Sequence, residues 1–143
     1  MLTLTSVLGI DTSQTGKYKI HFAIGDKSNF KTEPLAAYRQ GTFKQWQERQ
    51  SKKNFERDYI LSLIYFRPDH WLFGGIYRSN GCEKRGHKYY YDTELLDIHT
   101  DLIARMVIKY KKPFRQSYPL LETCDSSLIV SEILEKPSMI EPF

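Results

Sequence analysis

Two neighbouring runs of apolar and aromatic residues, at 59–66 (YILSLIYF) and 71–78 (WLFGGIYR), constrain the fold more than any other feature of the chain. Both runs are short and rich in β-branched or aromatic side chains, which favours strands over helices. The turn sequence Arg67-Pro68-Asp69 separates them, and Gly74-Gly75 inside the second run indicates a β-bulge. The sequence therefore predicts two strands joined by a turn.

Other segments have the same strand-like character. Residues 17–24 (KYKIHFAI) alternate polar and apolar side chains, which is typical of a half-buried strand. Ser79-Asn80-Gly81 predicts a turn, and residues 84–87 predict a polar loop tip. Further strands are expected at 88–95, 102–109, 116–122 and 128–135.

One segment has a helical pattern instead. From Pro34 to Tyr59, apolar side chains recur at roughly helical spacing, and proline is well suited to a first helical turn. Gly41 divides the segment into two short helices. We therefore expect an α+β fold, with a strongly curved antiparallel sheet or small pseudo-barrel and a short helical segment. Residues 1–135 would form one β-rich domain, and 136–143 a C-terminal linker or tail.

Size and composition indicate an ordinary globular domain. A chain of 143 residues with 41% hydrophobic residues buries about two-thirds of its surface on folding, so it needs no metal or disulfide. Cys82 and Cys124 form no CxxC pattern, and two reduced, partly buried thiols are expected, with a disulfide between them as the alternative. Since neither a signal peptide nor a membrane-length apolar run is present, a cytoplasmic protein without membrane contact is expected.

Positive charge is concentrated in two segments, although the net charge is only +4. Residues 39–57 hold six bases against Glu48 and Glu56, and residues 105–115 hold five bases and no acid. Lysine and arginine neutralise phosphates, and interleaved aromatic and Gln or Ser side chains can contact bases. The predicted DNA contacts are Arg39, Lys44, Trp46, Arg49, Gln50, Ser51, Lys52, Lys53, Lys109, Lys111, Lys112, Arg115, Gln116 and Tyr118.

A short motif points to a different function. Gly75-Ile76-Tyr77 matches the first triplet of the GIY-YIG nucleases, and Tyr89-Tyr90-Tyr91 lies at the spacing of the second. The second triplet lacks its glycine, and the next arginine, Arg105, lies in a strand-like run. A three-letter match is weak, so the interpretation is a plain antiparallel hairpin. The alternative is a degenerate or metal-dependent nuclease that uses Tyr77, Tyr89, Arg105 and Glu122.

No other catalytic or metal-binding pattern converges. The four histidines are scattered, and Cys82 with His87 has no further ligand at zinc spacing. Asp92, Glu94 and Asp97, with Asp101 beyond, could hold a divalent cation, but a solvated strand edge is the favoured interpretation. We expect no catalytic residues, no metal and no cofactor.

Three stretches carry a family resemblance: 34–51 (PLAAYRQGTFKQWQERQS), 59–77 (YILSLIYFRPDHWLFGGIY) and 102–118 (LIARMVIKYKKPFRQSY). In this order they resemble the N-terminal domain that precedes the catalytic domain in one group of bacterial GIY-YIG nuclease family proteins. The final residues 140–143 (IEPF) resemble the junction to that domain, and the likeness covers most of residues 7–143. The resemblance implies an accessory or specificity domain, and it makes the Gly75-Ile76-Tyr77 match a coincidence.

The expected function is therefore a DNA-binding or specificity module of a restriction-type nuclease system. It would hold DNA for a nuclease domain that is joined at its C-terminus or acts in trans. A protein-interaction adaptor is a further alternative, which predicts an exposed apolar patch instead of clustered bases.

Overall fold

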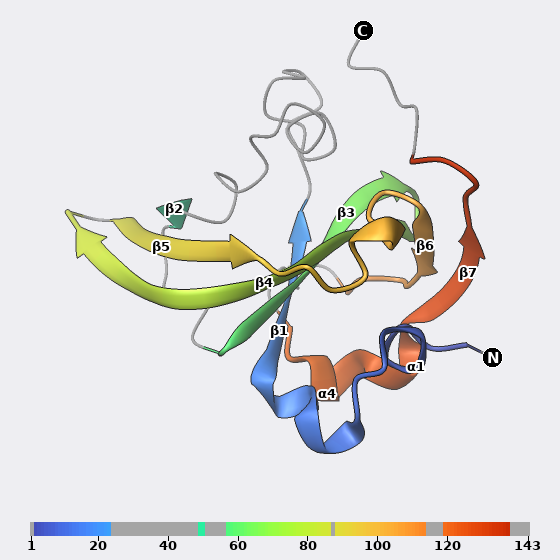
Figure 1. Ribbon diagram of the computed structural model, residues 1–143, viewed down its shortest axis with the longest axis horizontal. Coiled ribbons are helices and arrows are strands. Elements are labelled where there is room, and N and C mark those ends of the chain that lie inside the picture. The colour runs from blue at the N-terminus through green and yellow to red at the C-terminus, as the bar shows by residue number, and fades with distance from the viewer. Residues whose placement is uncertain (1, 24–48, 51–56, 87, 114–118, 138–143) are drawn as a thin grey trace, which may run out of the picture.

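The computed structural model describes residues 2–23, 49–50, 57–86, 88–113 and 119–137. Seven strands form one sheet in the order β1-β3-β4-β5-β2, and β6 pairs with both β4 and β7. The sheet curves strongly and stays open, and only short helices accompany it (Figure 1). The predicted α+β class with a curved sheet is confirmed.

The two strands that dominate the sequence form the centre of the sheet. β3 (Tyr59–Arg67) pairs antiparallel with β4 (His70–Arg85) through a turn in which Asp69 has φ 60°. Leu61 lies opposite Ile76 but Leu63 lies opposite Phe73, so β4 holds one extra residue at Gly74-Gly75. Both the strand pair and the bulge are as predicted. The apolar run is nearly continuous because the middle of β3 is buried on both faces.

The turn predicted at Ser79-Asn80-Gly81 is wrong. β4 continues through these residues to Arg85, and the chain reverses at Gly86 before β5 (Lys88–Leu95). Ser79 lies opposite Thr93 and Cys82 opposite Tyr91, so the glycine belongs to a second bulge, with φ 126° at Gly81. A positive φ at glycine serves a bulge as well as a turn, and the local sequence does not distinguish them.

β1 (Tyr18–Ala23) confirms the strand predicted at 17–24, but it pairs parallel to β3, so the sheet is not wholly antiparallel. The helices predicted from Pro34 onward lie mostly outside the described residues. Where the segment is described, the prediction is wrong, because Arg49–Gln50 forms strand β2 beside β5. Pairing with a distant strand overrides the weak helical spacing.

The C-terminal third adds two strands. β6 (Met106–Lys109) pairs with the start of β4 and with β7 (Ile129–Ile133). The short helix η3 (Thr100–Leu102) and a turn precede β6, so the predicted strand 102–109 begins four residues late. β7 lies inside the strand predicted at 128–135, and only residues 136–137 of the predicted tail are described.

The strand predicted at 116–122 is corrected where it is described. Residues 114–118 lie outside the described chain, and α4 (Leu121–Cys124) continues into η4 (Asp125–Ser127). Leu121 and Cys124, three residues apart, both lie in the core. A helical turn buries such a pair on one side, whereas a strand would separate them.

Short helices connect the two edges of the curved sheet. α1 (Leu4–Leu8) and η1 (Thr12–Lys17) lie with α4 below the sheet (Figure 1). Single bridges join Thr3 to Ile129 of β7 and Lys19 of β1 to Leu120. The segment that follows Leu120 therefore runs from the edge at β1 to the edge at β7, which gives an incomplete barrel.

Aromatic side chains fill the core between β1, β4 and the end of β6. The Phe22 ring contacts Trp71 edge-on at 4.7 Å and stacks on Tyr110 at 5.5 Å. Cys124 is buried with a free thiol, and burial raises its pKa to about 11, so the alternative of a Cys82–Cys124 disulfide is not realised. Within the described ranges, no helix is long and apolar enough to cross a membrane.

Candidate nucleic-acid interface

The segment after β6 presents two lysines on a fixed backbone. Lys109 and Lys111 are exposed, and Tyr110 between them is buried. The Tyr110 carbonyl accepts a hydrogen bond from Trp71 Nε1 at 3.1 Å, and its amide donates to the Asp69 carbonyl at 3.0 Å. From Ile108 to Lys111 buried and exposed residues alternate past the end of β6, and packing of Tyr110 holds both lysines in place.

These residues line a cleft of about 570 Å³, whose other walls are Ser127 and Ile129. We call it the lysine cleft. Ile129 is the strand partner of Lys109, so the cleft lies where β6 ends and β7 begins. None of the described carboxylates forms an ion pair with either lysine. Two ammonium groups without a described carboxylate partner, together with a hydroxyl, suit an anionic oxygen such as that of a phosphate at this open cleft.

The strand register extends the basic character beyond the cleft. Lys109 lies opposite His70 of β4, and His70 lies opposite Arg67 of β3. Arg67 already contacts Glu132 at 3.4 Å, with both side chains about half exposed. Exposed pairs of this kind are weak, so Arg67 can exchange its partner for a phosphate.

The third predicted lysine of this segment, Lys112, differs from the other two. Its side chain is partly buried, and Nζ donates to the Pro113 carbonyl at 3.5 Å. Burial lowers the pKa of Lys112. Lys109 and Lys111 are therefore the phosphate-binding candidates that the structure places at the surface.

The described parts of the two predicted basic segments are not brought together. β2, with Arg49 and Gln50, pairs with β5 at Tyr90 and Tyr89, whereas β6 pairs with the first residues of β4. In Figure 1 these strands lie on opposite sides of the body. The other predicted contact residues lie outside the described chain: Arg39, Lys44, Trp46, Ser51, Lys52, Lys53, Arg115, Gln116 and Tyr118.

Comparison with protein-family models, with curated proteins and with solved structures finds no match to this chain.

Two bases that the charge pattern counts are bound to the protein itself. Arg57 donates to the Glu122 carboxylate at 2.7 Å and to the Tyr18 carbonyl at 3.4 Å. The hydrogen bond to Glu122 holds the pKa of that carboxyl below its ordinary value. Arg105 donates to the carbonyls of Leu134 and Asp101, both at 2.9 Å. Both arginines tie distant segments together, and nothing in the sequence around them indicates it.

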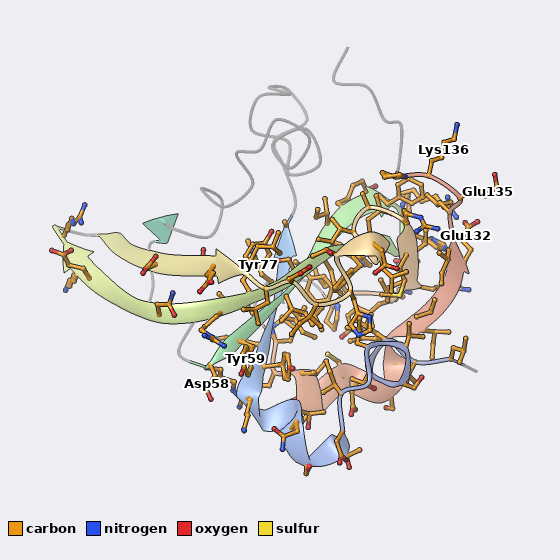
Figure 2. All side chains as sticks on the ribbon, viewed as in Figure 1. Asp58, Tyr59, Tyr77, Glu132, Glu135 and Lys136 are labelled. Carbon is orange, nitrogen blue, oxygen red and sulfur yellow. The ribbon has the colours of Figure 1, made fainter. Side chains whose placement is uncertain are left out.

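The residues of the nuclease alternative have separate structural roles. Tyr77 is 3% exposed, its hydroxyl donates to the Gly74 carbonyl at 3.2 Å, and it lies in the body of the molecule at the base of the β4–β5 hairpin (Figure 2). Glu122 is held by Arg57, and Arg105 binds backbone carbonyls. The described side chains of this alternative therefore do not converge on one another.

The Gly75-Ile76-Tyr77 triplet has a packing explanation. Gly75 has φ 104°, and a Cβ there would lie 2.8 Å from Leu95 Cδ1. Ile76 is 2% exposed. The triplet thus forms the central bulge and the core beside it, a role that requires glycine and two apolar side chains without any catalytic requirement.

Among the described residues, no group of three His, Cys, Asp or Glu side chains could hold a metal ion. Asp92 and Glu94 are exposed on β5, and Asp97 accepts a hydrogen bond from Thr100 at 3.3 Å. His99 lies 2.9 Å from the Leu8 carbonyl, which gives it a role in joining segments. His87 lies outside the described residues.

The adaptor alternative predicts an exposed apolar patch. The exposed large apolar side chains of the described chain come from several different segments: Leu2, Leu95, Ile98, Leu120 and Ile133. Leu95 ends β5 and Ile133 ends β7, two strands that do not pair. No observation therefore favours this alternative over the lysine cleft.

The sequence prediction missed one exposed feature. Because residues 79–81 were expected to form a turn, the second half of β4 was not expected to be strand. Beyond Ser79 and its partner Thr93, β4 and β5 continue as a ribbon that projects from the body, and β2 lies beside β5 at Tyr89 and Tyr90 (Figure 1). The sequence signal for this ribbon is the polar run at 83–88 (EKRGHK), which follows the glycine bulge and contains the actual turn at Gly86.

Proposed function

We propose that this chain is a non-catalytic DNA-binding module whose lysine cleft docks on the phosphate backbone of duplex DNA. The observation that carries the proposal is the pair Lys109 and Lys111, exposed at an open cleft without a described carboxylate partner, on either side of the buried Tyr110. Neutralisation of phosphates by such side chains supplies most non-specific DNA affinity.

The fixed backbone supports binding rather than a loose surface charge. Residues two apart on an extended chain are separated by about 6.6 Å, and the Tyr110 contacts hold this spacing before DNA arrives. A preformed arrangement loses less entropy on binding than a flexible charged tail does. The lysine cleft can therefore orient the module on the duplex as well as attract it.

Cleavage would be performed by a partner. The resemblance to a nuclease-associated N-terminal domain supports a restriction-type system in which a nuclease domain acts from the C-terminal side or in trans. The separate structural roles of Tyr77, Arg105 and Glu122 support a module without a catalytic centre. A free, buried Cys124 fits the proposed location in the reducing cytoplasm.

Binding to a fluorescent duplex at about 50 mM and about 200 mM salt tests the proposal. Affinity should fall steeply with salt, because each phosphate contact releases counterions. The double variant Lys109→Ala with Lys111→Ala should bind more weakly, and the slope of log affinity against log salt should shrink by about two, one for each lysine.

Lys136→Ala is the matched control. Lys136 is exposed beyond the end of β7 that is remote from the lysine cleft (Figure 2), and its substitution removes one positive charge, as each of the two cleft substitutions does. It should bind nearly as the wild type does. A flat salt response of the wild type, or a double variant that behaves as the control does, would contradict docking at the lysine cleft.

A further inference from the structure

The ribbon formed by residues 79–85 of β4 and 88–93 of β5, here called the β arm, is the most prominent projection of the described chain (Figure 1). Its described side chains on the outer half of β4 are exposed, including Asn80, Glu83, Lys84 and Arg85. The first part of β4, from Trp71 to Tyr77, is almost completely buried. Apart from Ser79 and the buried Thr93 at its base, the described side chains of the β arm contribute little to the core, so its projection needs another explanation.

The dimensions of the β arm fit a DNA groove. Six residue steps from Ser79 to Arg85 span about 20 Å, at about 3.3 Å per residue. The major groove of B-form DNA is about 12 Å wide and about 8.5 Å deep, and it admits a two-stranded β-ribbon. β2 lies beside β5 at Tyr89 and Tyr90, so the end of the β arm beyond β2, at Arg85 and Lys88, is the two-stranded part that can reach base edges while the body stays outside the groove.

The charge at the end of the β arm is complementary to DNA. The residues around the turn, 83–88, hold Lys84, Arg85 and Lys88 against the single acid Glu83. Arg85 contacts Glu83 at 3.0 Å, but both side chains are more than 60% exposed. Such an exposed pair contributes little, so DNA phosphates or bases can compete with Glu83 for Arg85.

A further strand adds residues of the same kind beside the β arm. β2 pairs with β5, so Arg49 lies opposite Tyr90 and Gln50 opposite Tyr89. Tyr89 in turn lies opposite Lys84. The register thus brings Arg49 and Gln50 of the first basic segment to the β arm, far from the lysine cleft.

We propose that the β arm enters the major groove of duplex DNA, with Arg85 at its tip as a base-contacting residue. This inference rests on the proposed function, because the lysine cleft would hold the backbone while the β arm reads the groove. Arginine makes bidentate contacts with the O6 and N7 atoms of guanine, which lysine cannot make in the same way. The major groove of A-form RNA is too narrow for such an element.

The double variant Lys84→Ala with Arg85→Ala tests the β arm. We expect its affinity for a DNA duplex at fixed salt to fall about tenfold, and its affinity for an RNA duplex of the same sequence to stay within about twofold of the wild type. Arg78→Ala is the control, because Arg78 is exposed at the base of the β arm and is a single cation on the same strand. It should change DNA affinity less than threefold.

Methylation of guanine N7 identifies the groove, since this atom lies in the major groove. The modified duplex should bind the wild type more weakly than the unmodified one does, and this difference should shrink in the Lys84→Ala, Arg85→Ala variant. Circular dichroism and the thermal midpoint of the variant should match those of the wild type, which excludes a folding defect as the cause.

The outcomes separate the two proposals. If the wild type binds DNA with a steep salt dependence but the β-arm variant binds as tightly, the β arm is overturned and the lysine cleft stands. If methylation weakens wild type and variant alike, Arg85 does not contact the groove and the inference is overturned. If the wild type does not bind DNA at all, the proposed function itself has failed.

Discussion

The two halves of β4 have opposite relations to the rest of the molecule. From Trp71 to Tyr77 the strand lies between β3 on one side and β6 or β5 on the other, and its side chains are buried. From Arg78 to Arg85 it pairs mainly with β5, and its described side chains are largely exposed. One continuous strand thus supplies the core at one end and a surface for a partner at the other. Changes in the first half should affect stability, and changes at the outer end of the second half, at Lys84 and Arg85, should affect binding.

The largest effect on stability is expected for a substitution at Gly75, in the buried half of β4. An alanine there would place Cβ 2.8 Å from Leu95 Cδ1 and 3.2 Å from Ile103 Cδ1, at φ 104°. Backbone strain of about 1–2 kcal/mol adds to overpacking of about 1–3 kcal/mol. Gly75→Ala should therefore lower the free energy of unfolding by about 2–5 kcal/mol in urea denaturation.

Gly86→Ala is the matched control at the end of the β arm. Gly86 also has a positive φ, 62°, but nothing lies within 4 Å of an added Cβ. Strain of about 1–2 kcal/mol is partly offset by about 0.4–1 kcal/mol from a less flexible unfolded chain. Equal losses for the two alanines would show that the bulge at Gly75 is not closely packed.

A second substitution in the buried half links the core to the lysine cleft. Trp71→Phe removes the donor to the Tyr110 carbonyl, which lies in the core between the two lysines. A buried carbonyl without a partner costs about 1–3 kcal/mol, and the thermal midpoint should fall accordingly. DNA affinity of the folded variant should also decrease, because one of the contacts that fix Tyr110 between Lys109 and Lys111 is lost. Wild-type affinity in a clearly destabilised variant would mean that the cleft does not depend on this anchor.

The buried half of β4 was predictable from the sequence, and the exposed half was not. The apolar runs, the turn at Asp69 and the bulge at Gly74-Gly75 are local signals, and a continuous apolar stretch fits few other environments. The glycine at position 81 has two possible uses, a turn or a bulge, and only the partner strand β5 decides between them. The parallel pairing of β1 and the strand at β2 depend on distant partners in the same way.

For the interface, the sequence predicted the position of Lys109 and Lys111 but not which bases are available. The apolar strand before them indicated a fixed presentation, and β6 provides it. Arg57 and Arg105 belong to the same basic segments, yet both have partners within the protein. Arg57 binds Glu122, and Arg105 binds the carbonyls of Leu134 and Asp101. A charge count cannot identify such intramolecular partners, because they meet only after folding.

An ion pair at the surface of the body should have an intermediate effect. Arg57 lowers the pKa of Glu122 by a hydrogen bond, so the carboxylate stabilises the fold above its ordinary pKa and loses this contribution as pH falls through the lowered value. Glu122→Gln should reduce stability near pH 7 by about 0.2–1 kcal/mol, because the pair is partly exposed. As pH falls through this lowered pKa, the difference from the wild type should shrink. A constant difference at all pH values would show that the charge of Glu122 is not what stabilises the fold.

The smallest effect on stability is expected for Arg85→Ala, at the exposed end of β4. The side chain is 62% exposed, and its pair with Glu83 spans only two residues of the same strand. Exposed substitutions of this kind usually change the free energy of unfolding by less than about 0.5 kcal/mol. Urea denaturation of Arg85→Ala should therefore nearly coincide with that of the wild type, although binding to a DNA duplex is weakened. A loss of stability comparable to that of Gly75→Ala would instead make the β arm part of the core, because a residue that only faces solvent or DNA has no packing to lose.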